Sequence, residues 1–191
     1  PWLRKHFPDV AIIDYVHMEE WYWRNGGHAR SSAIMGKVLE RTYVCNSATR
    51  DVMIDHFHRL PDEVETVHIG IDEKLFDASK VREGLLYREL GIKEDRPIIL
   101  FICRLHPQKR PFLMLKIAEY VKRYVPNAAF AVIGDGPLEQ ELIQTSKAMN
   151  LKETVYFLGA KSEVRPYYRD AKITLICSVK EGLALTAYES C

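Results

Sequence analysis

From residue 96 onward, short apolar runs alternate with longer stretches in which apolar residues recur every three or four positions. The first such stretch begins with Pro111, a residue favoured in the first turn of a helix. Continuous apolar strands joined by helical crossovers are typical of a parallel sheet covered on both faces, so the pattern predicts a doubly wound α/β domain. We expect its strands at residues 98–103, 129–133, 155–158 and 173–177, with helices over 111–125 and 138–149 and a short helix before the last strand.

Residues 1 to 70 form a second α/β block with weaker periodicity. The polar stretch over 72–80 is the best candidate for a linker, and residues 81–90 already read as a helix of the following domain. We therefore divide the chain into a domain of residues 1–75 and a domain of residues 76–191. In the first block we expect strands at 10–16, 42–45 and 64–69 and helices near 32–40 and 48–57.

Charge, cysteine content and the length of apolar runs narrow the partners, the compartment and the kind of site that we expect. The chain has 27 Lys and Arg against 26 Asp and Glu, a formal net charge of +1 that gives no reason to expect a nucleic-acid partner. Its four cysteines show no Cys-x-x-Cys spacing, and three of them end apolar runs, so we expect buried thiols, a cytoplasmic location and no metal site. No apolar run approaches the roughly 18 residues that span a bilayer. Because the chain starts without an initiator methionine and ends inside an expected helix, we expect a fragment.

Polar or glycine-rich turns follow all four strands expected after residue 96. Ligands of open parallel sheets bind at the carboxyl ends of the strands, so these turns are expected to face one crevice. They comprise residues 104–110, 134–137, 159–161 and 178–182.

The turn after the first of these strands carries cations. It contains neither Gly-x-Gly-x-x-Gly nor a glycine-rich run ending in Gly-Lys-Ser/Thr. It offers Arg104 and Lys109 instead, and Arg and Lys side chains can contact a diphosphate directly. Taken alone, the segment is better interpreted as a solvated basic loop.

Two carboxylates, Glu181 and Glu189, stand eight positions apart across a loop and the start of a helix. At a helical rise of about 1.5 Å per residue they would lie roughly 12 Å apart, a span that suits a nucleotide-sugar. The free N–H groups of the helix start lie between them and favour an anion. The alternative is a pair of surface glutamates flanking a buried helix.

Four segments in this order carry a family resemblance: Cys-Arg104-Leu-His-Pro-Gln-Lys109, Ile-Gly134-Asp-Gly-Pro137, Phe-Leu-Gly159 and Glu181-Gly-Leu-Ala-Leu-Thr-Ala-Tyr-Glu189. Together they resemble the donor half of the group 1 (family 4) glycosyltransferases of the GT-B architecture, over residues 98 to 189. More loosely, the segments that begin at Asp14 and at Gly70 resemble the end of the acceptor domain and the crossing into the donor domain.

The resemblance implies a role for each matching residue. Arg104 and Lys109 would hold the diphosphate, and Glu181 would hold hydroxyls of the donor sugar. Glu189 would accept hydrogen bonds from the ribose, and the loop around Lys161 would lie near the base. The remaining donor contacts would come from Gly134 and from the segment Gly182, Leu183, Ala184 and Leu185, whose backbone amides would complete the phosphate cradle.

His17 resembles the family histidine near the acceptor side of the donor sugar, so it is the second catalytic candidate beside Glu181; a structural histidine at a strand end is the alternative. Residues 26–30 read as a flexible connection in preference to an acceptor-side loop. The aromatic run 21–23 suits a stacked sugar, a buried edge or an interface. The sequence departs from the family pattern at three positions: Cys103 stands where Gly is common, Ile69 where Asn is common, and Ala184 where Gly or Pro is frequent. None of these departures removes a charged contact.

The resemblance implies a retaining glycosyltransferase that uses a nucleotide-diphosphate sugar as donor and a carbohydrate or lipid-linked acceptor, without a metal or other cofactor. Peripheral membrane association of the intact enzyme and self-association through exposed sheet edges are further expectations, and the 191-residue chain alone is expected to be inactive. Two alternatives stay open. One is another nucleotide-sugar enzyme of this architecture, an epimerase or phosphorylase, and the other is a non-catalytic binding protein with the same core.

Overall fold

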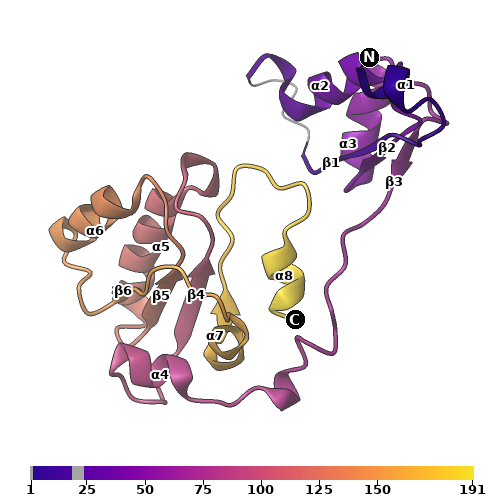
Figure 1. Cartoon of the computed structure of the whole chain (residues 1–191). Helices are drawn as coiled ribbons and strands as arrows, with labels where there is room; N and C mark the ends of the chain where they lie inside the picture. Colours follow the sequence, from indigo (N-terminus) through magenta and orange to yellow (C-terminus); the bar gives the residue numbers. More distant parts are fainter. Residues whose placement is uncertain (1, 19–23) are drawn as a thin grey trace. The chain divides into compact units, whose positions relative to one another are not determined.

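The computed structural model describes residues 2–18 and 24–191, which form two compact units (Figure 1). Unit 1 comprises Pro1–Gly70 together with Glu181–Ala184, and unit 2 comprises Ile71–Lys180 together with Leu185–Cys191. The aromatic run 21–23 lies outside the described residues. None of the described helices is both long and apolar enough to cross a membrane.

Unit 2 contains a four-stranded sheet in the order β6-β5-β4-β7, with every pair parallel. The central pair is held in register by partners such as Ile99 and Phe130, and the residues of β5 are buried throughout. Such continuous burial requires cover on both faces of the sheet. The strands are β4 Ile98–Ile102, β5 Ala129–Ile133, β6 Val155–Phe157 and β7 Ile173–Thr174.

Helices supply that cover on both faces. One buried cluster joins Phe101, Phe130 and Val132 to α5 (Pro111–Tyr124) and α6 (Glu139–Ala148). A second cluster packs Leu100 and Ala131, which point the other way, against α4 (Leu85–Leu90) and α7 (Arg165–Asp170). The doubly wound α/β fold expected from the apolar pattern is therefore confirmed.

The start of α4 is capped from a distant part of the chain. The buried carboxylate of Asp170, at the end of α7, accepts hydrogen bonds from the Gly84 amide at 2.7 Å and the Leu86 amide at 2.8 Å. These are amide groups that no residue of the helix itself can satisfy. Asp170 thus ties the two helices of one face together.

Unit 1 has a smaller parallel sheet in the order β1-β2-β3. Buried and half-buried residues alternate along β2, and the described core gathers around Val44, Met53 and Val64. Asn46 caps α3 by accepting a hydrogen bond from the Thr49 amide at 2.7 Å. The elements are α1 Trp2–His6, β1 Ile13–Val16, α2 Gly27–Met35, β2 Arg41–Val44, α3 Ser47–Asp51, the π-helical η2 Val52–His56 and β3 Val64–Thr66.

Several elements differ from the sequence expectation. The helix expected near 32–40 begins at Gly27, so the interpretation of residues 26–30 as a flexible connection is wrong over 27–30. The helix expected over 48–57 divides into α3 and η2. Strand β7 keeps only two residues of the expected run 173–177. Three short 3-10 helices were not expected: η1 Arg24–Gly26, η3 Ala78–Lys80 and η4 Pro107–Lys109.

Candidate functional site

The turn that follows β4 is fixed through its main chain. The Cys103 amide donates to the Ile133 carbonyl at 3.0 Å, and the Leu105 amide donates to the Asp135 carbonyl at 2.7 Å. The side chain of Leu105 is fully buried, whereas the residue between them, Arg104, is exposed. The backbone of the turn is therefore anchored, while Arg104 is exposed at the carboxyl end of β4.

Two glycines allow the turn after β5 to approach so closely. A Cβ atom on Gly134 would lie 2.0 Å from the Cys103 carbonyl oxygen, and one on Gly136 would lie 2.5 Å from that of Leu105. Both glycines also have positive φ, at 125° and 153°. Gly134 therefore permits the close backbone contact that supports the cationic turn.

Lys109 ends the 3-10 helix η4, in which its amide donates to the His106 carbonyl at 2.9 Å. The next residue, Arg110, has a left-handed backbone with φ of 50° and directly precedes Pro111 at the start of α5. The left-handed backbone at Arg110 separates η4 from α5 and thereby sets the position of Lys109 relative to β4.

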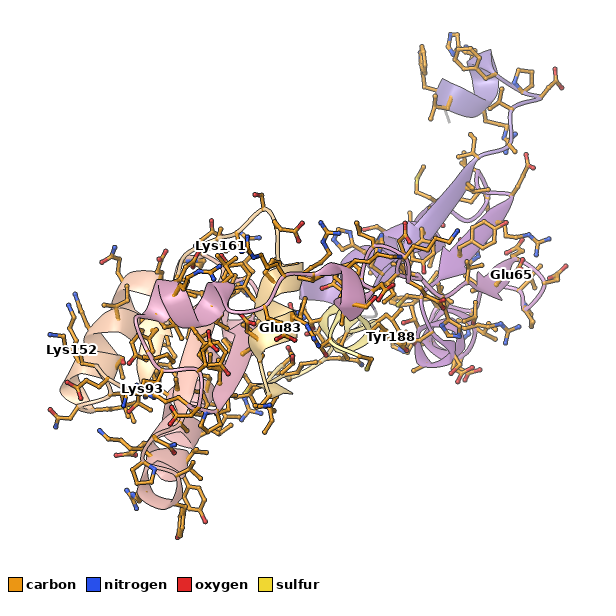
Figure 2. All side chains as sticks on the ribbon, turned by 90° about the horizontal axis from the view of Figure 1, so that it is seen from below. Glu65, Glu83, Lys93, Lys152, Lys161 and Tyr188 are labelled. Atoms are coloured by element: carbon orange, nitrogen blue, oxygen red, sulfur yellow. The ribbon has the colours of Figure 1, made fainter. Side chains whose placement is uncertain are left out.

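The third turn joins the same edge of the sheet, because the Gly134 amide donates to the Gly159 carbonyl at 2.9 Å. Beyond it lies Lys161, which is labelled in Figure 2. Its ammonium lies 3.0 Å from a carboxylate oxygen of Glu89 in α4 and 5.6 Å from the ring centre of Tyr167. The hydrogen bond to Glu89 raises the pKa of Lys161. The side chain of Lys161 thus takes part in a structural ion pair, and its suggested place near a base stays a prediction.

Glu189 lies in the five-residue helix α8, Leu185–Glu189. Its carboxylate accepts a hydrogen bond from the phenol of Tyr168 in α7 at 2.8 Å. Burial, with the Glu189 hydrogen bond second, raises the pKa of Tyr168, so the phenol stays a donor at physiological pH. Both residues line a pocket of about 200 Å³ with Arg165 and Arg169. The hydrogen bond from Tyr168 orients a carboxylate that has acceptor sites for further donors.

The other predicted residues belong to unit 1. A Cβ atom on Gly182 would lie 1.7 Å from the His17 carbonyl oxygen, so only glycine fits there. The same carbonyl accepts from the Cys45 thiol at 2.8 Å, and the Asn46 side-chain amide donates to the Gly182 carbonyl. His17 and the segment that begins at Glu181 are therefore placed in the same unit.

The His17 side chain lines a second pocket, of about 600 Å³, in unit 1. Asp14, His28 and Ser31 contribute its polar groups, and Met35 is among its apolar ones. Within the described part of the chain, Asp14 Oδ1 is buried and has no hydrogen-bond partner. A buried carboxylate oxygen of this kind favours a ligand that donates a hydrogen bond.

The predicted site residues are thus distributed over both units. Unit 2 holds Arg104, Lys109, Gly134, Lys161, Leu185 and Glu189, and unit 1 holds His17, Glu181, Gly182, Leu183 and Ala184. Three residues that sequence reasoning missed, Gln108, Tyr168 and Asn46, contact these elements. Tyr168 and Gln108 act on partners 21 and 72 residues away, so no local pattern identifies them; Asn46 could have been found as a helix cap.

The cysteines are described by their pairing and their burial. All four cysteines are free, and burial raises the pKa of Cys45 and of Cys177. The interpretation of these two as buried thiols is confirmed, whereas Cys103 is only half-buried. Among the residues that the structure describes, no three His, Cys, Asp or Glu side chains are arranged to hold a metal ion.

Comparison with known proteins identifies the family. The family model for glycosyl transferases group 1 matches residues 85–191, more than half of the chain. The chain belongs to the group 1 glycosyltransferases. This confirms the resemblance inferred from the four motifs, and the matched segment contains the turns after all four strands of unit 2.

Two curated relatives match the chain over part of their own length. The chain is 38% identical over 120 residues to a Campylobacter jejuni alpha-1,4-N-acetyl-D-galactosaminyltransferase, covering 62% of this chain and 29% of that protein. It is 26% identical over 198 residues to the alpha-monoglucosyldiacylglycerol synthase of Streptococcus pneumoniae, covering 97% of this chain and 43% of that protein. The chain spans less than half the length of both relatives.

Solved structures confirm the fold class. Anabaena HepE in complex with UDP-glucose superposes with a TM-score of 0.80 at 16% identity, covering 98% of this chain and 52% of that one. The pneumococcal O-GlcNAc transferase GtfA in complex with UDP and GlcNAc gives a TM-score of 0.78 at 16% identity, covering 98% and 37%. At this identity the likeness establishes the GT-B-like α/β fold alone.

Proposed function

We propose that the intact protein is a glycosyltransferase that moves a sugar from a nucleotide-diphosphate sugar to a carbohydrate or lipid-linked acceptor. The observation that carries this proposal is the cationic turn with Arg104 and Lys109, held at the carboxyl end of β4 by the glycine turn after β5. Membership of the group 1 glycosyltransferases supports a nucleotide-diphosphate sugar as the ligand of this turn.

In this proposal Arg104 and Lys109 bind the diphosphate and stabilise the negative charge that develops as it departs. Stabilisation of developing charge by fixed donors is usually the largest single contribution to such a step. Backbone amides of Gly182, Leu183, Ala184 and Leu185 add donors, so that transfer proceeds without a metal ion. The arrangement costs little reorganisation because the turn is anchored before the ligand arrives.

The donor sugar and the ribose are assigned to the two glutamates. Glu181 accepts hydrogen bonds from sugar hydroxyls, and Glu189, oriented by the Tyr168 phenol at 2.8 Å, accepts from the ribose. The loop around Lys161 lies near the base, with the Lys161 side chain itself engaged by Glu89. Transfer with retention of configuration completes the proposal, on the family resemblance.

We place the acceptor in unit 1. His17 lines the pocket of about 600 Å³, and the unpartnered Asp14 Oδ1 would accept a hydrogen bond from an acceptor hydroxyl. The names of two relatives, one acting on an undecaprenol-linked saccharide and one a diacylglycerol glycolipid synthase, support a lipid-linked acceptor. We accordingly propose a cytoplasmic enzyme with peripheral membrane association. Self-association would involve sheet edges such as β7.

The test uses the full-length protein and measures affinity for UDP, GDP and ADP by thermal shift and calorimetry. Lys109→Ala should weaken the affinity for the nucleoside diphosphate that binds most tightly by about 10- to 150-fold, because a hydrogen bond to a charged group contributes roughly 1.5 to 3 kcal/mol. Affinity for the corresponding nucleoside should change little. Lys152→Ala is the matched control, since Lys152 is an exposed lysine of unit 2 in the connection between α6 and β6 (Figure 2).

Each outcome separates the proposal from its alternatives. Equal losses for diphosphate and nucleoside would refute the assignment of Lys109. No binding of any nucleotide by the full-length protein would indicate a non-catalytic binding protein. Nucleotide binding accompanied by epimerisation of the sugar would identify an epimerase, and binding accompanied by phosphorolysis would identify a phosphorylase.

A further inference from the structure

Gln108 connects two turns of the sheet edge through two hydrogen bonds. It lies in η4, between the two cations assigned to the diphosphate. Its main-chain carbonyl accepts from the Val179 amide at 2.9 Å, and its side-chain Nε2 donates to the Lys180 carbonyl at 3.0 Å. The side-chain bond is partly buried. One residue therefore contacts two consecutive residues of a segment that lies 71 and 72 positions further along the chain.

The segment that Gln108 contacts has left the sheet. Strand β7 ends at Thr174, and the last ladder-type bond runs from the Leu175 amide to the Leu100 carbonyl at 2.8 Å. Residues 175–184 have no regular secondary structure until α8 begins. Without continued strand pairing, individual hydrogen bonds fix the path of this loop, and Gln108 supplies one from its main chain and one from its side chain.

The contact constrains the residue that follows. Consecutive Cα atoms are about 3.8 Å apart, so fixing the carbonyl of Lys180 restricts where the backbone of Glu181 can begin. The donor of this constraint is the residue directly before Lys109. Gln108 thus relates the path of the chain that enters Glu181 to the turn that carries the cations.

We propose that Gln108 is a positioning residue for transfer, which fixes the loop that enters Glu181 against the cationic turn through its Nε2 bond to Lys180. This inference rests on the proposed function. Gln108 itself contacts neither donor nor acceptor in this proposal. Its effect is on the placement of Glu181 and therefore on turnover, more than on the affinity of the cations for a diphosphate.

The test substitutes the side chain and leaves the main-chain bond in place. Gln108→Met keeps the length of the side chain and removes its N–H donor, while the Val179 amide can still bond to the main-chain carbonyl. In the full-length enzyme, kcat should fall about three- to tenfold, as expected for one neutral hydrogen bond, and the Kd for UDP should stay within about twofold of the wild-type value. Gln144→Met, at an exposed position of α6, is the matched control and should change neither.

A second measurement distinguishes positioning from general destabilisation. If Gln108 acts through Glu181, the two substitutions should not be additive: in single-turnover assays, Gln108→Met should change the rate of Glu181→Gln by less than about twofold. Hydrogen exchange over residues 175–184 should become faster, while exchange over β5 should stay unchanged. Additive effects on the rate, or a loss of UDP affinity as large as the loss of kcat, would overturn the inference.

The proposed function fails in a different way. If wild-type protein binds none of UDP, GDP and ADP, or if Glu181→Gln alone leaves turnover unchanged, the assignment of the donor site is wrong. If the wild-type protein binds one of these nucleotides, if Glu181→Gln lowers turnover, and if Gln108→Met nevertheless turns over at the wild-type rate, only the role of Gln108 is refuted.

Discussion

The two units bury their sheets in different ways. In unit 2 the strand β5 is buried along its whole length, and helices pack on both faces. In unit 1 the central strand β2 alternates between buried and half-buried residues, and its described core is smaller. A sheet enclosed on both sides holds the turns at its edge rigidly, so the cationic turn is expected to be fixed by the core beneath it. The comparison can be tested by perturbing buried positions of the two units and the contacts that fix the turns and helices of unit 2.

The largest effect is expected from the core of unit 2. Phe130→Ala removes a fully buried ring of β5 from the cluster that includes α5 and α6, and should lower the free energy of unfolding by about 3 to 5 kcal/mol. Val44→Ala, at an equally buried position of unit 1, should cost about 1.5 to 3 kcal/mol. Urea denaturation followed by circular dichroism measures both. A larger cost for Val44→Ala would contradict the comparison.

The next effect concerns the glycine that lets two turns of unit 2 meet. Gly134→Ala would place a Cβ atom 2.0 Å from the Cys103 carbonyl oxygen, so the turn must move, at an expected cost of about 3 kcal/mol. Gly159→Ala is the control, because Gly159 also has positive φ but a Cβ atom there would meet nothing within 4 Å, and it should cost about 1 to 2 kcal/mol. Similar costs for both would show that backbone conformation, and not close approach, requires glycine at 134.

A third effect tests how helices are fixed to the sheet of unit 2. Asp170→Ala removes the acceptor of two amides at the start of α4 and leaves them buried, so the free energy of unfolding should fall by about 2 kcal/mol. Asp72→Ala removes an exposed carboxylate that accepts from the amides of Lys74 and Leu75 in the same way. Its cost should stay below about 1 kcal/mol, because water can replace it. Thermal unfolding of both variants measures the difference.

The smallest effect is electrostatic and depends on pH. The hydrogen bond from the Arg165 side chain, followed by that from the Arg165 amide, lowers the pKa of Glu163 from 4.5 to about 2. A lowered pKa means that the ion pair stabilises the folded state above pH 4.5 and that this contribution is lost as the pH falls from 4.5 towards 2. Because the pair is exposed to solvent, its effect on stability should be small. Glu163→Gln should remove it, and unchanged pH dependence of unfolding between wild type and variant would contradict the assignment.

Much of unit 2 could be predicted because its signal is local. Continuous apolar runs located all four strands, and β5 was placed at its observed bounds. Strand β7 was predicted too long because apolar residues beyond Thr174, such as Ile176, continue the run after the chain has left the sheet. An apolar run reports hydrophobicity, and strand pairing depends on what lies beside it.

Unit 1 was harder because tertiary contacts override local preference there. Gly26 and Gly27 suggested a loop, yet the helix α2 starts at Gly27, where its buried Ala29 packs on the sheet. In the candidate site, the place of Arg104 just after a strand could be predicted, because the apolar run marks where β4 ends. Contacts such as that of Tyr168 with Glu189 could not, because they join residues that only the folded chain brings together.

The turns of unit 2 meet through backbone atoms, and this has an evolutionary consequence. The carbonyl groups of Cys103 and Leu105 face glycines, so the side chain at position 104 takes no part in that contact. Exchanging Arg104 should therefore alter ligand preference while the melting temperature changes little. A fold that assigns its architecture to main-chain atoms and its chemistry to side chains can diverge in substrate without first losing its shape, which is one physical route by which a single scaffold acquires many specificities.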